Sequence, residues 1–172
     1  ITQGYLELIG QLASQGHSRI AFIGASPELK IDHDRYQGYL AGLESAAITP
    51  QPDLVTRADL TPEGGYQAAL RLLELATPPT ALVCVNDLTA IGAMHAVHER
   101  GLKVGRDVAV AGFDGIANAA HTQPPLTTLD QPVYDIARQL ATMLLALLTG
   151  QELPRRQIKI QPKLLIRAST DG

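Results

Sequence analysis

Tryptophan is absent from this sequence of 172 residues, cysteine occurs once, and aromatic residues make up 4% of it. A single cysteine excludes an internal disulfide bond. Cys84 lies in the apolar run 81–85, where a free thiol behaves as a small hydrophobic side chain. We therefore expect Cys84 to be an inert core residue, and a reducing compartment is favoured.

The sequence also lacks an excess of positive charge and a long apolar run. Its formal net charge is −3, so it has no basic face of the kind that binds a phosphate backbone. No stretch reaches the ~20 apolar residues that a membrane-spanning helix needs. We expect a cytoplasmic protein with no membrane partner, and any contact with DNA must come from another part of the protein.

Several motifs for catalysis and cofactor binding are missing. No Gly-x-Gly-x-x-Gly follows an apolar run, and neither a phosphate-binding loop nor a Gly-x-Ser-x-Gly nucleophile motif occurs. His95 and His98 are spaced one helical turn apart beside Glu99, but no third metal ligand accompanies them. We therefore expect no cofactor, no metal and no catalytic residue.

Four short apolar runs recur roughly every 30 residues, which is the length of a β-α-β unit. The runs are mostly continuous rather than alternating, as parallel strands buried on both faces require. Between them, apolar residues recur at helical spacing. This order predicts an α/β fold with a doubly wound parallel sheet. The expected strands are 20–23, 54–55, 81–85 and 108–113, and the expected helical stripes run over 5–12, 36–47, 66–73 and 90–97.

Capping residues mark the expected ends of three helices. Gly16 fits a C-cap for the first. Thr61-Pro62-Glu63 has the order of a hydroxyl N-cap, a first-turn proline and an acid. Asp87 is the expected N-cap of the helix that follows the run 81–85.

The last third of the sequence has a different pattern. A short strand is expected at 124–129, and Pro132 then begins a longer helix. Its apolar stripe runs from Val133 to Leu147, before Gly150. An extended segment follows, with apolar residues between 158 and 166.

Polar residues stand where the expected strands end. Asn86-Asp87 and Asp114-Gly115 come directly after the third and fourth runs, and Arg35 begins the helix after the first. In such sheets, ligands bind beyond the carboxyl ends of the strands. Carboxylates accept hydrogen bonds from hydroxyls, Asn both donates and accepts, and Arg donates through a fixed fork. With Leu60 as an apolar wall, this edge predicts a site for a hydroxyl-rich ligand.

Each of these residues also has a purely structural interpretation. Asp114-Gly115 is a common turn sequence, and Asp87 is a good helix cap. Asn86 could satisfy the end of a strand, and Arg35 could form a surface ion pair. Their convergence on one edge of the sheet favours the binding interpretation.

Five motifs follow one another along nearly the whole sequence. They are Gly16-His17-Ser18-Arg19-Ile20-Ala21-Phe22-Ile23-Gly24, Arg35-Tyr36-x-Gly38-Tyr39, Pro79-Thr80-Ala81 with Asn86-Asp87, Val108-Ala109-Val110-Ala111-Gly112-Phe113-Asp114, and Pro124-Pro125-Leu126-Thr127-Thr128. In this order and spacing they resemble the C-terminal effector-binding region of lactose-repressor/galactose-repressor (LacI/GalR) regulators. The resemblance implies a periplasmic-binding-protein-like fold (type I), with a sugar or nucleobase effector between two α/β lobes.

The resemblance also implies roles for individual residues. Arg35, Asn86 and Asp114 match positions that contact the effector. Leu60 matches a position that is often an aromatic residue stacked on the ligand, although leucine offers no ring face. Gln131 matches a polar position where the chain crosses between the lobes.

A homodimer is implied as well. The helix from Leu88 to Glu99, and the segment from Asn118 to Thr122, match parts of the family's dimer interface. Ile91 and His95 are expected on the exposed side of that helix. For Ile91, ordinary partial burial is the alternative.

The implied domain organisation has three parts. Residues 1–131 form the C-terminal lobe, 132–160 belong to the other lobe in an intact protein, and 161–172 are a return segment and tail. The DNA-binding head and most of the other lobe would then be missing from this sequence. We expect the stripe from Val133 to Leu147 to pack on a neighbouring molecule or to be partly exposed.

The implied function is sensing of a small-molecule effector, a sugar or related metabolite. The effector would shift the population of lobe arrangements and so control operator binding through the missing head. One alternative is a periplasmic sugar-binding protein for transport, which shares the fold but would carry a signal peptide. The other is an α/β enzyme, for which Asp59 and Asp114 are the candidate acids, although nothing in the sequence pairs them. We expect no enzymatic activity.

Overall fold

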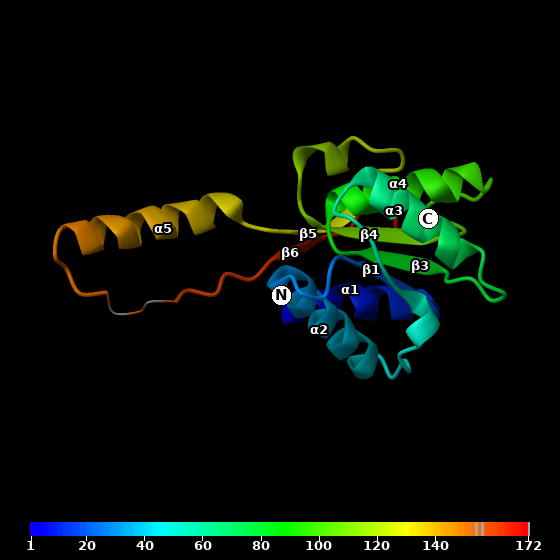
Figure 1. Ribbon diagram of the computed structural model, residues 1–172, viewed down its shortest axis with the longest axis horizontal. Coiled ribbons are helices and arrows are strands. Elements are labelled where there is room, and N and C mark those ends of the chain that lie inside the picture. The colour runs from blue at the N-terminus through cyan, green and yellow to red at the C-terminus, as the bar shows by residue number, and fades with distance from the viewer. Residues whose placement is uncertain (154, 156, 172) are drawn as a thin grey trace.

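The computed structural model describes residues 1–153, 155 and 157–171. A six-stranded sheet is covered by helices α1 to α4, and helix α5 projects away from it (Figure 1). In chain order the elements are α1 (Thr2–Ser14), β1 (Ile20–Gly24), α2 (Lys30–Ser45), η1 (Pro52–Leu54), β2 (Val55–Arg57), α3 (Pro62–Leu73), β3 (Ala81–Cys84), α4 (Asp87–Glu99), β4 (Ala109–Asp114), η2 (Ala117–Ala120), β5 (Thr127–Asp130), α5 (Val133–Leu148) and β6 (Lys163–Leu165).

The strands lie in the order β2-β1-β3-β4-β5-β6. The first five are mutually parallel, and β6 runs antiparallel to β5. Helices α1 and α2 cover one face and α3 and α4 the other (Figure 1). The predicted doubly wound parallel sheet is therefore confirmed, with one antiparallel strand added at its edge. That strand is antiparallel because the chain leaves the sheet at the carboxyl end of β5 and returns at the same end.

The core has two layers, one on each face of the sheet. Alternate residues of the central strands point into one layer or the other. In β1, Ile20 and Phe22 pack with α1 and α2, whereas Ala21 and Ile23 pack with α3 and α4. All five residues of this strand are buried. A strand between two helical layers must be apolar on both faces, which explains the continuous runs. Cys84 is buried in the α3–α4 layer, and this burial raises the pKa of its thiol.

The helix ends follow the predicted caps at some positions and differ at others. The Thr61 hydroxyl accepts a hydrogen bond of 3.1 Å from the amide of Gly64 and caps α3 as expected. The prediction for Ala47 was wrong. This residue lies beyond the end of α2 with a φ of 55°, because the helix stops at Ser45.

Helices α3 and α4 pack so closely that backbone atoms of each helix lie against a glycine of the other. A Cβ on Gly92 would meet the carbonyl oxygen of Pro62, and a Cβ on Gly65 would meet the carbonyl oxygen of Thr89. Glycine at both positions lets the two helices pack more closely than side chains would allow.

Residues 131–162, which we call the arm, leave the sheet after β5 and return at β6; the rest of the chain is the lobe. Helix α5 of the arm has no buried residue, and Leu148 is 74% exposed. The expectation that the apolar stripe is not buried within one monomer is confirmed. Pro154 and Arg156 of the predicted segment 132–160 lie outside the described residues. Within the described chain, no helix is long and apolar enough to cross a membrane.

Candidate functional site

Three of the predicted site residues meet at the carboxyl end of β4. Arg35 Nη2 donates to Asp114 Oδ1 over 2.8 Å, and Gln131 Nε2 donates to the same oxygen over 2.7 Å. The three residues come from α2, β4 and the start of the arm. The carboxyl side chain of Asp114 remains 32% exposed. The cluster therefore presents a carboxylate at the predicted edge.

Arg35 is buried and held by three contacts with the protein, although its Nε has no hydrogen-bond partner among the described residues. Its side chain is 2% exposed, its Nη1 donates to the carbonyl oxygen of Val85, and its guanidinium lies 3.9 Å from the ring centre of Phe113. An arginine engaged in this way orients a carboxylate more readily than it reaches a ligand. Both side-chain hydrogen bonds described for Asp114 end on Oδ1, so its Oδ2 has no hydrogen-bond partner among the described residues.

The turn that carries Asp114 is fixed by a buried acid. Asp114 has a φ of 119° and Gly115 a φ of 74°. Asp87 Oδ2 accepts from the amide of Ile116 over 2.9 Å, and its Oδ1 accepts from the Thr128 hydroxyl over 2.6 Å. Burial raises the pKa of the Asp87 carboxyl, and these hydrogen bonds partly oppose the rise.

The predicted N-cap of α4 was wrong by one residue. Asn86, not Asp87, caps the helix, because its Oδ1 accepts from the amide of Thr89 over 2.8 Å. Asp87 points instead into the protein, toward the turn after β4. Asn86 is half-buried at the end of β3, so its amide group stands on the same edge as Asp114.

Leu60 lies after β2, as predicted for an apolar wall. It is half-buried and packs against the α1–α2 side of the core. Asp59, the other acid considered for catalysis, is exposed. Among the residues that the structure describes, no group of three or more His, Cys, Asp or Glu side chains could hold a metal ion.

A second ion pair at this edge was missed by the sequence analysis. Arg57 Nη1 donates to Asp32 Oδ1 over 2.7 Å, and the backbone amide of Ala25 donates to the same oxygen over 2.7 Å. Arg57 is the last residue of β2, and Asp32 lies in the first turn of α2. The available signal was the position of Arg57 two residues after the apolar run 54–55, close to the predicted Asp59 and Leu60.

Comparison with known proteins identifies the family. The sequence matches the periplasmic binding protein-like domain over residues 9–170. The chain belongs to this family. It is 38% identical over 164 residues to the HTH-type transcriptional repressor CytR of Escherichia coli (strain K12), covering 95% of this chain and 48% of the relative. The chain thus spans about half the length of the curated relatives it matches.

Solved structures of the family share the fold. A regulatory protein of the LacI family from Chloroflexus aggregans superposes with a TM-score of 0.93 at 36% identity, over 99% of this chain and 61% of that one. A complex of the transcriptional regulator CelR with cellobiose gives 0.91 at 30% identity, over 98% and 51%. The lac repressor dimer bound to operator and the anti-inducer ONPF gives 0.89 at 29%, over 99% and 59%. The predicted resemblance to LacI/GalR regulators is confirmed.

Three of the five residues predicted for a dimer interface lie together, and the other two are exposed. Ile91 and His95 of α4 line a shallow pocket of about 190 Å³ together with Thr122. Leu88 at the start of α4 is 42% exposed, and Asn118 on η2 is exposed as well. The pocket therefore brings α4 and the segment after η2 together on this periplasmic binding protein-like lobe.

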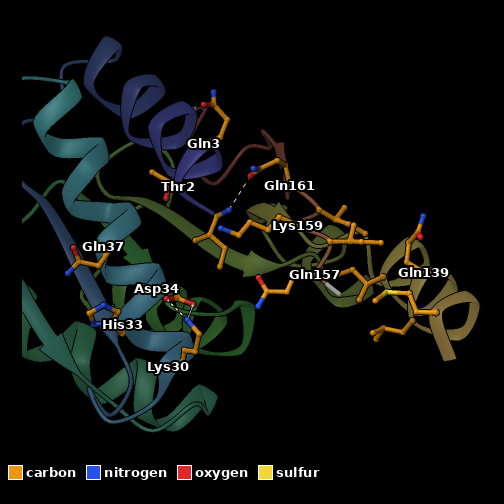
Figure 2. Close-up of a pocket in the computed structure, with 16 residues that line it drawn as sticks. Thr2, Gln3, Lys30, His33, Asp34, Gln37, Gln139, Gln157, Lys159 and Gln161 are labelled. Atoms are coloured by element: carbon orange, nitrogen blue, oxygen red, sulfur yellow. Dashed lines mark hydrogen bonds and ion pairs between the residues drawn. The ribbon is translucent and has the colours of Figure 1, made fainter. Parts of the chain in front are cut away.

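A larger pocket of about 890 Å³ lies between the arm and the start of α1 and α2. Figure 2 shows Lys30, His33 and Asp34 of α2 on one side and Gln139 of α5 on the other, with Gln157 between them. None of the predicted effector residues lines this pocket. It is instead the space between the lobe and the exposed stripe of the arm.

Proposed function

We propose that this chain is the effector-sensing region of a DNA-binding transcriptional regulator. The observation that carries the proposal is the cluster of Arg35, Asp114 and Gln131 at the carboxyl edge of the sheet. In doubly wound folds that edge is where ligands bind. The relatives that share this region are transcriptional repressors and regulators.

The chemistry of the edge favours a sugar-like effector. Asp114 is oriented by two donors on one oxygen and offers its second oxygen to a hydroxyl. Asn86 contributes an amide, and Leu60 an apolar surface. The related regulator CelR was solved with cellobiose, which is a ligand of this chemical kind.

DNA binding would come from a part of the protein outside this sequence. The chain carries a net charge of −3, and its relative CytR is named an HTH-type repressor. We propose a cytoplasmic protein in which the effector shifts the equilibrium between two lobe arrangements and thereby changes operator affinity. This role requires no catalysis.

The arm and the face of α4 fit the remaining parts of this proposal. Segment 132–160 belongs to a second lobe, whose core would cover the exposed stripe of α5 and occupy the 890 Å³ pocket. The face with Leu88, Ile91, His95, Asn118 and Thr122 would bind a second copy of the chain, and the related lac repressor was solved as a dimer. Transport is disfavoured because the relatives are regulators.

Calorimetry on the full-length protein tests the site. The probes are D-glucose, D-ribose, N-acetylglucosamine, uridine and glucose 6-phosphate. For any probe that binds, Asp114→Asn should weaken the affinity about tenfold or more, because a charged acceptor is lost. The control Asp171→Asn, an exposed acid near the C-terminus, should leave it unchanged. Binding that is unaffected by Asp114→Asn would exclude this edge, and no binding of any probe would overturn the sugar-like class.

A further inference from the structure

The pair of Arg57 and Asp32 lies at the same carboxyl edge as Arg35 and Asp114. We infer that Arg57 donates a hydrogen bond to an acceptor on the effector, and that Asp32 is the positioning residue that holds Arg57 in place. The inference rests on the proposed function, because it adds a contact to the same effector site.

The guanidinium of Arg57 is placed over the end of β1. A Cβ on Gly24, the last residue of β1, would meet both Arg57 Nη1 and Asp32 Oδ1. The absence of a side chain at Gly24 therefore makes room for the ion pair above the strand. Since β3 alone separates β1 from β4, the strand ends beneath the two ion pairs lie two strand spacings apart, about 10 Å.

Arg57 is oriented by Asp32 and two aromatic rings but remains partly exposed. Its guanidinium lies 4.8 Å from the ring centre of Tyr36 and 5.7 Å from that of Phe22. Within the described part of the chain, Nη1 makes its hydrogen bond to Asp32, and the side chain stays 31% exposed. An arginine has five N–H donors, so oriented donors are left for a ligand.

Stability alone does not account for this pair. Asp32 is 1% exposed, and no described residue supplies a hydrogen-bond partner for its Oδ2. Burying a carboxylate costs free energy, and apolar residues of similar shape often stabilise a fold as well as a buried ion pair does. The pair instead places an oriented, partly exposed arginine at the edge of the sheet where ligands bind.

The two pairs together define the class of ligand. At one end Asp114 accepts from a hydroxyl, and at the other Arg57 donates to an acceptor. Because Asp32 already neutralises Arg57, an uncharged acceptor such as a carbonyl oxygen suffices. With ~2.8 Å for each hydrogen bond, about 4–5 Å remains between the ligand's own polar atoms. The geometry points to one polyhydroxylated ring that carries a carbonyl-bearing substituent.

The test uses the full-length protein and two pairs of probes. N-acetylglucosamine and D-glucose differ by a carbonyl-bearing group, and so do uridine and D-ribose. The double variant Asp32→Asn/Arg57→Gln removes both charges and leaves no buried charge unpaired. It should weaken binding of the carbonyl-bearing probe about tenfold or more and change binding of the plain sugar less than about twofold. The matched control is Arg106→Gln. Arg106 precedes β4 in the sequence and forms its ion pair with Asp107.

Other outcomes overturn the inference. Equal losses for both members of a pair would assign a structural role to Arg57, and no loss would remove it from the site. A wild-type preference for both plain sugars would also contradict it. In each of these cases sensitivity to Asp114→Asn leaves the proposed function intact, whereas failure of every probe to bind the wild-type protein would overturn both.

Discussion

The lobe and the arm have similar apolar patterns and opposite burial. Tyr5, Leu8, Ile9 and Leu12 form the stripe of α1, and all four are buried. The stripe of α5 is as regular, yet none of its residues is buried. The contrast shows that helical periodicity predicts an apolar contact surface but not whether the partner surface is present in the same chain.

Substituting one leucine in each region tests this contrast. Leu82 is fully buried in the centre of the sheet, whereas Leu145 of α5 is 62% exposed. In the 172-residue chain, Leu82→Ala should lower the free energy of unfolding by about 3 kcal/mol. Leu145→Ala should change it by less than about 0.5 kcal/mol. Urea denaturation measures both, and equal costs would contradict the exposed position of the arm.

A glycine substitution should sharpen the contrast, because close helix packing is confined to the lobe. Gly92→Ala places a Cβ against the backbone of α3 and should cost about 1–3 kcal/mol. Gly10→Ala in α1 has nothing within 4 Å of the new Cβ. It should stabilise the chain by about 0.5–1 kcal/mol. Thermal unfolding compares the two, and similar effects at both sites would rule out tight α3–α4 contact.

The smallest expected effect is a dependence of the free energy of unfolding on pH. The folded lobe raises the pKa of the Asp87 carboxyl by burial, so the folded state binds its proton more tightly than the unfolded state. The resulting stabilisation is present below the ordinary value of 3.8 and is lost as pH rises through the raised pKa. Melting curves from about pH 3 to pH 7 should show this loss for the wild type relative to Asp87→Asn.

The arm again supplies the control for this pH dependence. Asp135 of α5 is exposed, so Asp135→Asn should leave the slope of stability against pH as it is in the wild type. An unchanged slope in Asp87→Asn would mean that the carboxyl of Asp87 does not titrate differently in the folded state.

Local patterns predicted the strands to within a few residues and most of the helices, because burial on two faces leaves a continuous apolar run and burial on one face of a helix leaves a periodic one. The strand expected at 54–55 was misplaced, because Leu54 ends η1 and β2 runs from Val55 to Arg57. They did not distinguish the roles of Asn86 and Asp87, which are both good capping residues. The choice depends on where each side chain points at the end of β3, and that is set by the turn after β4. Likewise, Arg35 was predicted at the edge, but its burial against Phe113 follows from packing between elements.

The pair of Arg57 and Asp32 shows a different limit. The two residues are 25 positions apart, and they meet because β2 lies next to β1 in the sheet. No single run of residues determines the order of the strands in the sheet. The direction of β6 could not be predicted for the same reason, since it depends on where the arm returns.

The pairing of β5 with β6 has a consequence for how the molecule is built. Asp130 and Lys163 are cross-strand partners, so the chain departs and re-enters at points about 5 Å apart. A two-residue reverse turn bridges such a gap. In topological terms the arm is an insertion at the tip of a β-hairpin formed by β5 and β6. A shortened protein in which a tight turn joins β5 directly to β6 would keep every strand of the sheet.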